Sequence, residues 1–170
     1  KFADARNCLD YETEIKKHLD IKLEHSLPSD EWNSIALNYT SGTTGNPKGV
    51  VYHHRGAYLN AIGNILTWDL PMHPKYLWTL PMFHCNGWCF PWTITERAGT
   101  HVCLRQLSGE LIVKAFQNHN ITHLCGAPIV MQMIADYLLQ NDISLKIDIK
   151  MMTAGAPPPE AVLSKMASCG

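Results

Sequence analysis

The stretch Tyr39-Thr-Ser-Gly-Thr-Thr-Gly-Asn-Pro-Lys-Gly-Val-Val-Tyr52 places four hydroxyl side chains, three glycines and a lysine between two short apolar runs. Glycines let backbone N–H groups approach an anion closely, and a row of such amides forms an anion-binding concavity. Lys48 adds a compact positive charge on a flexible stem. The side chains that add hydroxyl donors are Thr40, Ser41, Thr43 and Thr44. The stretch predicts a loop that binds a polyphosphate, and Asn46-Pro47 predicts a turn that leads back into a strand from Val50.

Two other interpretations of this stretch compete with phosphate binding. A Ser/Thr/Gly-rich surface turn is the commonest fate of such a composition, but plain turns rarely combine this hydroxyl density with a lysine. The P-loop pattern G-x-x-x-x-G-K-[ST] almost fits from Gly42. However, Pro47 stands where the second glycine is needed and removes an N–H group, and Gly49 replaces the Ser/Thr that would bind magnesium.

Composition places the chain among globular proteins with a real core. The 170 residues fit one domain, with 46% hydrophobic and 17% charged residues and a formal net charge of −1. This charge gives no electrostatic case for binding nucleic acid. No apolar run approaches the roughly 18 residues of a spanning helix, so we predict no membrane span. The chain opens with Lys1 rather than methionine, so we expect its natural start to lie elsewhere.

The six cysteines and nine histidines do not form a metal-binding pattern. The cysteines contain no C-x-x-C pair, and beside a nucleotide loop they are best interpreted as reduced core thiols. The spacing of His84, Cys85, Cys89 and His101 matches no zinc pattern. We therefore assign no residue of this chain as a metal ligand.

Short apolar strands alternate with helical patterns after a polar lead-in segment over residues 1–33, which includes a short amphipathic helix over 11–23. We predict strands at 34–39, from Val50, and at 76–80, 101–104, 121–125 and 150–153. We predict helices at 54–69, 88–97, after a Ser108 cap, from Pro128, and at 158–166. This alternation predicts an α/β domain over 34–170, with a predominantly parallel sheet flanked by helices. Such sheets bind ligands at the carboxyl ends of their strands, and the chemically informative motifs follow predicted strands.

Three motifs together carry a resemblance to a known family. They are Thr40–Lys48 with Gly49-Val50-Val51, Leu80-Pro-Met-Phe-His-Cys-Asn-Gly-Trp88, and Met152-Thr-Ala-Gly-Ala-Pro-Pro-Pro159. In this order they resemble the adenylate-forming acyl-activating enzymes, which are acyl-CoA synthetases and their relatives. His53-His54-Arg55-Gly56 with Phe83-His84-Cys85-Asn86-Gly87 looks most like the plant acyl-activating ligases. The match runs from about Ile35 to the end of the chain.

The resemblance implies the ATP-binding part of an acid–thiol ligase, within the large N-terminal domain of an acyl-CoA synthetase-like fold. Such an enzyme activates a fatty or small organic acid as an acyl-adenylate and transfers it to CoA, with ATP and Mg²⁺ required. A role in fatty acid or lipid metabolism inside the cell follows, in the cytoplasm or the peroxisome. The alternatives are a truncated, non-catalytic nucleotide-binding protein and, with less support, a P-loop-type NTPase.

The resemblance also implies roles for particular residues. Those implied to hold the β- and γ-phosphates are Thr40, Ser41, Gly42, Thr43, Thr44, Gly45 and Lys48. Those implied to lie against adenine are Gly155, Ala156 and Pro157. The implied catalytic residues are Lys48, His84 and Thr44. Taken from the residues alone, His84 is a packing histidine beside Trp88 and Trp92; the resemblance instead implies that it lines the path between ATP and the acyl group and positions them.

Several parts of such an enzyme are expected beyond Gly170. The resemblance implies that a glutamate for Mg²⁺, an aspartate for the ribose, the hinge and the smaller C-terminal domain lie there. We therefore expect residues 34–170 to be a partial adenylation domain that needs the rest of the same polypeptide and is inactive by itself. Gly126-Ala127-Pro128 resembles the adenine segment locally, but the family match places it at a helix start near the acyl pocket, where its role is structural.

Overall fold

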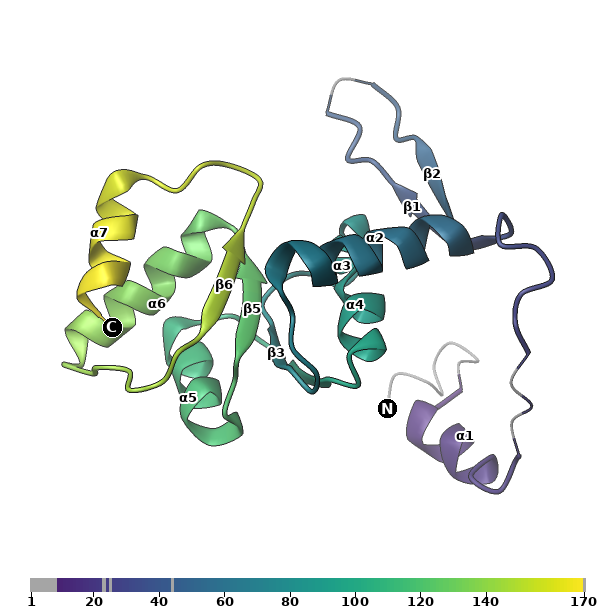
Figure 1. The fold of residues 1–170 in the computed structure, drawn as a ribbon, viewed down its shortest axis with the longest axis horizontal. Helices are drawn as coiled ribbons and strands as arrows, with labels where there is room; N and C mark the ends of the chain where they lie inside the picture. Colours follow the sequence, from purple (N-terminus) through teal and green to yellow (C-terminus); the bar gives the residue numbers. More distant parts are fainter. Residues whose placement is uncertain (1–8, 23, 25, 44, 170) are drawn as a thin grey trace. The chain divides into compact units, whose positions relative to one another are not determined.

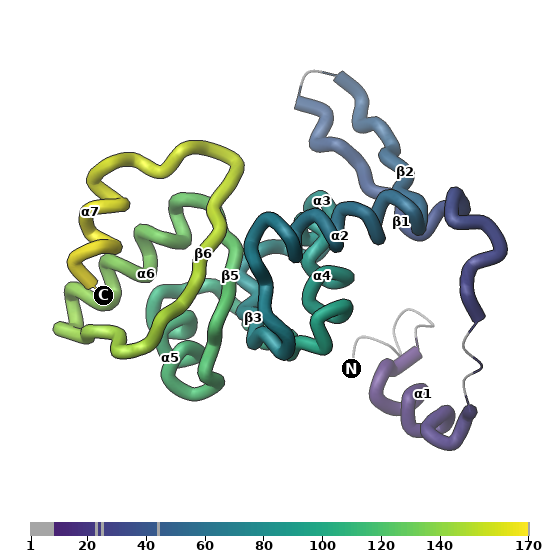
Figure 2. The backbone as a smooth tube through the Cα atoms, in the orientation of Figure 1, coloured from purple at the N-terminus to yellow at the C-terminus, as the bar shows by residue number. Residues whose placement is uncertain are grey.

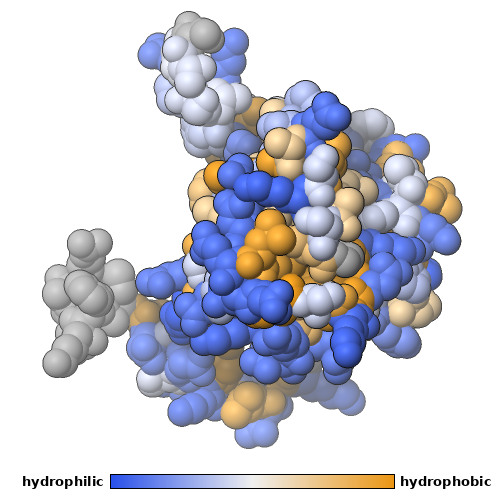
Figure 3. Space-filling view, turned by 90° about the vertical axis from the view of Figure 1, so that its left-hand side faces the viewer, coloured by the Kyte–Doolittle hydropathy of each residue, from blue (hydrophilic) through white to orange (hydrophobic). Residues whose placement is uncertain are grey.

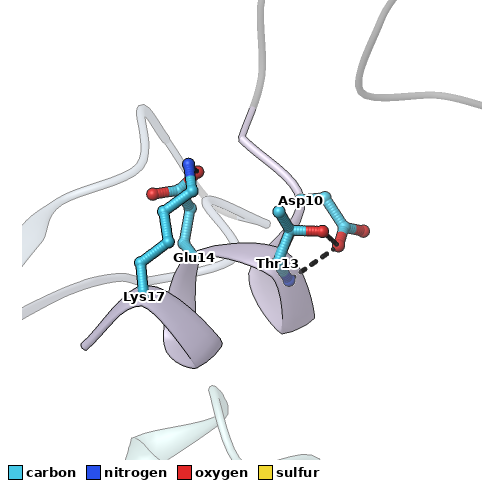
Figure 4. A network of polar contacts seen from close by, with 4 residues as sticks. All are labelled: Asp10, Thr13, Glu14 and Lys17. Atoms are coloured by element: carbon cyan, nitrogen blue, oxygen red, sulfur yellow. Dashed lines mark hydrogen bonds and ion pairs between the residues drawn. The ribbon is translucent and has the colours of Figure 1, made fainter. Parts of the chain in front are cut away.

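The computed structural model describes residues 9–22, 24, 26–43 and 45–169. The chain divides into two compact units, Lys1–Asp30 and Glu31–Gly170. The first unit contains α1 (Tyr11–Lys17). Asp10 caps this helix, since its carboxylate accepts hydrogen bonds from the Thr13 N–H (2.9 Å) and the Thr13 hydroxyl (2.7 Å), as Figure 4 shows. The predicted helix over 11–23 is too long, because no residue of α1 is buried and tertiary packing therefore does not extend it.

The second unit begins with a hairpin of β1 (Ser34–Tyr39) and β2 (Gly49–His53). The two strands pair antiparallel, with Tyr39 opposite Gly49. They form a sheet of their own. The loop does lead back into a strand near Val50, as expected. The expectation that Ser34–Tyr39 belongs to the parallel sheet is wrong, because a nine-residue loop can join only antiparallel neighbours and both strands bond to each other.

A four-stranded parallel sheet forms the centre of this unit, in the order β4-β3-β5-β6. Its strands are β3 (Lys75–Trp78), β4 (Thr100–Cys103), β5 (His123–Gly126) and β6 (Lys150–Thr153). The helices of the unit are α2 (His54–Trp68), α3 (Cys85–Trp88), α4 (Phe90–Glu96), α5 (Gly109–His119), α6 (Pro128–Gln140) and α7 (Glu160–Ser168). The predicted α/β class with a predominantly parallel sheet is confirmed.

Helices cover both faces of this sheet (Figures 1 and 2): α2 and α4 lie on one side, and α5, α6 and α7 on the other. A hydrophobic core lies on each face of the sheet, and successive side chains of a strand point alternately into one core and the other. Leu77 and Leu124 join a cluster with residues of α5 and α6. Tyr76 and Cys125 join the opposite cluster, which includes Phe90 of α4. The central strand β5 is buried at all four positions, as expected where helices cover both faces of a sheet.

The predicted helix over residues 88–97 differs from the observed structure. Its first residue, Trp88, is the last residue of α3, and α4 begins only at Phe90. The two elements are separate because Cys89 takes a left-handed conformation between them and Pro91 lies in the first turn of α4. Ala98 takes a left-handed conformation (φ 48°) after the end of α4. Gly99 follows it, where a Cβ would lie 2.8 Å from the Pro74 carbonyl oxygen.

The face carrying α5, α6 and α7 is mostly hydrophilic, with a patch of hydrophobic side chains in its middle (Figure 3). α5 begins at a cap formed by Ser108, and it turns one side toward the core, since its buried positions recur at helical spacing. These positions are Ile112, Val113, Ala115 and Phe116. No helix among the described residues is both long and apolar enough to cross a membrane.

Candidate functional site

The loop between β1 and β2 is closed by two hydrogen bonds at its base. The Thr40 N–H donates to the Lys48 carbonyl oxygen, and the Lys48 N–H donates to the Thr40 hydroxyl oxygen, each at 3.0 Å. Gly42 is half-buried with φ +69°, and a Cβ there would lie 2.7 Å from the Gly45 carbonyl oxygen. Only glycine fits that bend. The predicted residue Thr44 lies outside the described residues.

The other predicted phosphate-binding residues that the structure describes are exposed to solvent. They are Thr40, Ser41, Thr43, Gly45 and Lys48. The Thr40 hydroxyl uses its oxygen to accept the Lys48 N–H bond, so its own hydrogen stays available for a ligand. The loop therefore presents hydroxyl groups and an ammonium group outward from a closed base, which is the arrangement expected of an anion site.

A pocket of about 750 Å³ connects the start of this loop with the segment after β3. Thr40 and Ser41 line it from the hairpin, and His84 and Cys85 line it from the other side. His84 is exposed and stands immediately before α3. Two motifs that are far apart in the sequence thus share one cavity. Asn38 also lines this pocket, and its buried amide nitrogen has no hydrogen-bond partner.

A second pocket of about 550 Å³ adjoins the first, and Tyr52 and Cys85 line both. Among the described residues, its wall carries no Asp, Glu, Lys or Arg. Burial raises the pKa of the Tyr52 phenol, and the neighbouring thiols of Cys85 and Cys89 raise it further. Burial also raises the pKa of the Cys89 thiol. Both groups are neutral at pH 7, so this pocket suits an uncharged, partly apolar body.

The adenine-type segment takes a different position from the other two motifs. Gly155, Ala156 and Pro157 are exposed and line neither pocket, although Met152 of the preceding strand lines the second. Gly155 has φ +92°, which favours glycine. Thr153, at the end of β6, has a buried hydroxyl oxygen without a partner. The structure therefore brings the loop and His84 together and leaves this segment at the neighbouring strand end.

The sheet order explains why the segments that follow β3 and β6 emerge at the same edge of the parallel sheet. The connection from β3 runs outward to β4, while that from β5 runs the other way to β6. A crevice forms at the carboxyl ends of strands where the connections diverge. Thr79, directly after β3, donates a hydrogen bond across this point to the Cys125 carbonyl oxygen of β5. His84 follows β3 and therefore emerges beside that crevice.

Sequence reasoning missed a left-handed turn beside His84. Residues 85–89 all have positive φ, at 44°, 40°, 55°, 55° and 68°. Each non-glycine residue in this conformation costs about 1–2 kcal/mol, so a run of them persists only where its surroundings hold it. The dipeptide Asn86-Gly87 is a turn signal that could have indicated a break here. Gly87 is required, because a Cβ would lie 2.7 Å from the Trp78 ring.

The Trp78 ring is itself fixed by a histidine. Its indole N–H donates to His101 Nδ1 at 2.9 Å. The Thr95 hydroxyl donates to the Pro91 carbonyl oxygen (2.6 Å), so at 3.2 Å it accepts from His101 Nε2. These bonds require the neutral Nε2–H tautomer. Burial lowers the pKa of His101 in agreement with that assignment.

Among the described residues, no group of three or more His, Cys, Asp or Glu side chains could hold a metal ion. The donors that Mg²⁺ prefers are oxygens. The residues described here therefore do not fit a metal site made by this chain alone.

A phosphate-type loop beside a cavity at the strand ends of a parallel sheet defines a nucleotide-binding α/β protein. The chain belongs to the AMP-binding enzyme family, whose model matches residues 3–170.

Curated relatives show the same relationship. The chain is 46% identical over 144 residues to the 2-methylpropanoate–CoA ligase CCL4 of Humulus lupulus, covering 85% of this chain and 26% of that protein. It is 51% identical over 140 residues to the peroxisomal acetate/butyrate–CoA ligase AAE7 of Arabidopsis thaliana, covering 82% of this chain and 25% of that protein. The chain thus spans about a quarter of the length of these relatives.

Solved structures support the fold. The inhibitor-bound N-terminal domain of FACL13 from Mycobacterium tuberculosis superposes with a TM-score of 0.80 at 22% identity, over 92% of this chain and 40% of that one. The expectation of a fold like part of an acyl-CoA synthetase N-terminal domain is confirmed.

Proposed function

We propose that this chain is the ATP-binding part of an AMP-forming acid–thiol ligase. The single observation that carries the proposal is the cavity of about 750 Å³ where Thr40 and Ser41 of the hydroxyl-rich loop meet His84. The relatives named above are ligases of acetate, butyrate and 2-methylpropanoate. We therefore propose a small carboxylic acid as the substrate, with ATP and CoA as co-substrates. Residues 34–170 would be a partial adenylation domain, after a lead-in segment over 1–33.

In this proposal the loop binds the β- and γ-phosphates. Its proposed ligands are Thr40, Ser41, Gly42, Thr43, Thr44, Gly45 and Lys48. The closed base fixes the ends of the loop, while the outward hydroxyl and amide donors surround the anion. Lys48 lies at the base, and its ammonium group follows the charge that develops on the departing pyrophosphate. Lys48 and Thr44 are therefore proposed as catalytic residues.

The carboxylic acid would occupy the second pocket. At about 550 Å³ this pocket falls within the roughly 300–1,000 Å³ of small-molecule sites. Its neutral wall suits an alkyl chain, and Cys85 marks the opening toward the phosphate side. His84 stands at that opening, so we assign it the role of positioning the carboxylate against ATP. Adenine would lie against Gly155, Ala156 and Pro157, which follow β6, two strands away from β3 along the same edge of the sheet.

The proposed reaction has two steps. A carboxylate oxygen attacks the α-phosphorus of ATP, forming the acyl-adenylate and releasing pyrophosphate. The CoA thiol then loses its proton and attacks the acyl carbon, which releases AMP and forms the thioester. The contribution of this chain is to hold the phosphates, orient the carboxylate and exclude water from the acyl pocket.

Mg²⁺ would neutralise phosphate charge when bound. Because the described residues offer no cluster of donors, we place its ligands mostly outside this chain, in the remaining part of the same polypeptide. For the compartment, we propose the cytoplasm or the peroxisome, since two curated relatives carry a peroxisomal description.

The test uses the complete gene product with a panel of short, medium and aromatic acids. We expect acid-dependent exchange of labelled pyrophosphate into ATP, greatest with short acids. Lys48→Ala should slow adenylation by roughly 10²-fold, as the loss of one transition-state donor does elsewhere. Lys146→Ala is the matched control, because Lys146 is also an exposed lysine but does not belong to the loop between β1 and β2. Release of the γ-phosphate in place of pyrophosphate, or an unaffected Lys48→Ala enzyme, contradicts the proposal.

A further inference from the structure

The left-handed turn over residues 85–89 carries groups that both pockets share. His84 directly precedes it, Cys85 lines both cavities, and Trp88 and Cys89 line the second. A small rotation of this turn would therefore move the wall between the two pockets. Whatever fixes the turn also fixes the relation between them.

Two polar side chains, the half-buried Asn64 and the buried Thr93, bind the end of this turn. The Asn64 amide of α2 donates to the Trp88 carbonyl oxygen and to the Thr93 hydroxyl oxygen, each at 3.1 Å. Thr93 of α4 is fully buried, and its hydroxyl donates to the Cys89 carbonyl oxygen at 2.9 Å. The Trp88 carbonyl oxygen is thus held by an amide of α2. The Cys89 carbonyl oxygen is held by the Thr93 hydroxyl together with the Thr93 backbone N–H, which donates to it at 3.1 Å.

A third contact holds the turn from the same side. The Cys89 thiol donates to the Ala57 carbonyl oxygen of α2 at 3.2 Å. Two hydrogen bonds therefore join the turn to α2, and two join it to Thr93 of α4. Ordinary packing does not require a threonine at position 93, because a valine has the same shape and would fill the same buried space without binding Cys89 or Asn64.

We propose that Asn64 and Thr93 are positioning residues that hold the turn over 85–89 and so set His84 and Cys85 between the two pockets. The inference rests on the proposed function where it concerns the reaction. Thr93 lines neither pocket and acts through the backbone of the turn, whereas Asn64 binds the same turn and also lines the second pocket. Loss of their hydrogen bonds lets the turn leave its left-handed conformation, which misplaces His84 and opens the wall at Cys85.

The test uses the complete protein with Thr93→Val and Thr93→Ser. The first readout is the rate at which a small thiol reagent labels Cys85, measured by mass spectrometry of peptides. Cys103 is the internal reference, because it is exposed and lies on β4. We expect Thr93→Val to change the Cys85 rate roughly fivefold to tenfold relative to Cys103, the factor for one lost hydrogen bond. Thr93→Ser should restore the wild-type ratio.

The second readout is pyrophosphate exchange at varied acid and ATP. We expect Thr93→Val to lower kcat and raise KM for the acid while KM for ATP stays near wild type. Ser168→Ala is the control, since the Ser168 hydroxyl of α7 also donates to a backbone carbonyl oxygen, that of Lys165, but is exposed and lines neither pocket. If Thr93→Val does not fold, Asn64→Ala carries the expectation for the labelling ratio alone, because Asn64 also lines the second pocket and its loss changes acid binding directly.

The outcomes separate this inference from the proposed function. A protein without acid-dependent exchange defeats the proposed function, while the labelling ratio still tests the turn. An unchanged ratio in folded Thr93→Val, an equal rise at Cys85 and Cys103, or failure of Thr93→Ser to restore the ratio overturns the inference. A Cys85 that never reacts while Cys103 does also overturns it, because the turn would then not face the cavity.

Discussion

Replacing Gly42 with alanine should weaken ATP binding more than the same change three residues away. Gly42 has φ +69°, and its added Cβ would lie 2.7 Å from the Gly45 carbonyl oxygen and 2.9 Å from the Pro47 side chain. Gly45 has open space at the corresponding position, with nothing within 4 Å. The two variants add the same methyl group to the same loop, so they separate backbone geometry from composition.

The size of the effect follows from the conformation. A left-handed L-residue costs about 1–2 kcal/mol, which corresponds to roughly a fivefold to thirtyfold change in an equilibrium constant. The close approach to Gly45 and Pro47 adds to this, because the loop must shift before the methyl fits. If ATP binds the observed bend, Gly42→Ala should raise the Kd for ATP by roughly tenfold or more.

The assay is equilibrium binding of a non-hydrolysable ATP analogue to the complete protein, by calorimetry. Gly45→Ala should show a clearly smaller loss. A Gly42→Ala protein that binds the analogue as tightly as wild type would refute the assignment of the loop. Equal losses in both variants would refute the geometric explanation, since they would show that any added methyl group disturbs the site.

Three further outcomes are expected from the same protein. Ser108→Ala, which removes the cap of α5, should lower the free energy of unfolding by about 1 kcal/mol in denaturant titrations, whereas Ser144→Ala at an exposed position should not. His101 has a lowered pKa, so the unfolded chain binds a proton first as pH falls below about 6.5, and stability declines there. In His101→Asn the free energy of unfolding should fall less over this pH range. The fall that remains comes from His123, whose pKa is also lowered by burial. His84→Ala should reduce the rate and the acid selectivity of pyrophosphate exchange; preserved selectivity would rule out a positioning role.

Local patterns were sufficient for most elements of the domain. The strand Ser34–Tyr39 and the strand Lys150–Thr153 were predicted with their observed bounds. α2 was predicted within one residue of its end, because Pro71 and the helical spacing of apolar residues limit it. These features depend on neighbours a few residues apart, so a single sequence contains the necessary information.

Long-range geometry escaped the same reasoning. The hairpin could not be distinguished from a member of the parallel sheet, because strand patterns do not reveal pairing partners. The predicted helix over 88–97 included Trp88 and Cys89 of the left-handed run, because the bond from Asn64, 24 residues earlier in the chain, to the Trp88 carbonyl oxygen leaves no local signal. Position 99 requires glycine because Pro74, far away in the sequence, and Ile94 leave no room for a Cβ there.

The sequence by itself determined the α/β class, the phosphate-type loop and the chemical character of His84 and its neighbours, since these follow from residue type and short spacing. Only the tertiary structure decided the order β4-β3-β5-β6, the shared cavity between Thr40 and His84, and the turn that separates the two pockets. The physical reason is that a cavity consists of distances between side chains far apart in the chain. Those distances are set by how sheet and helices pack, and no local pattern records them.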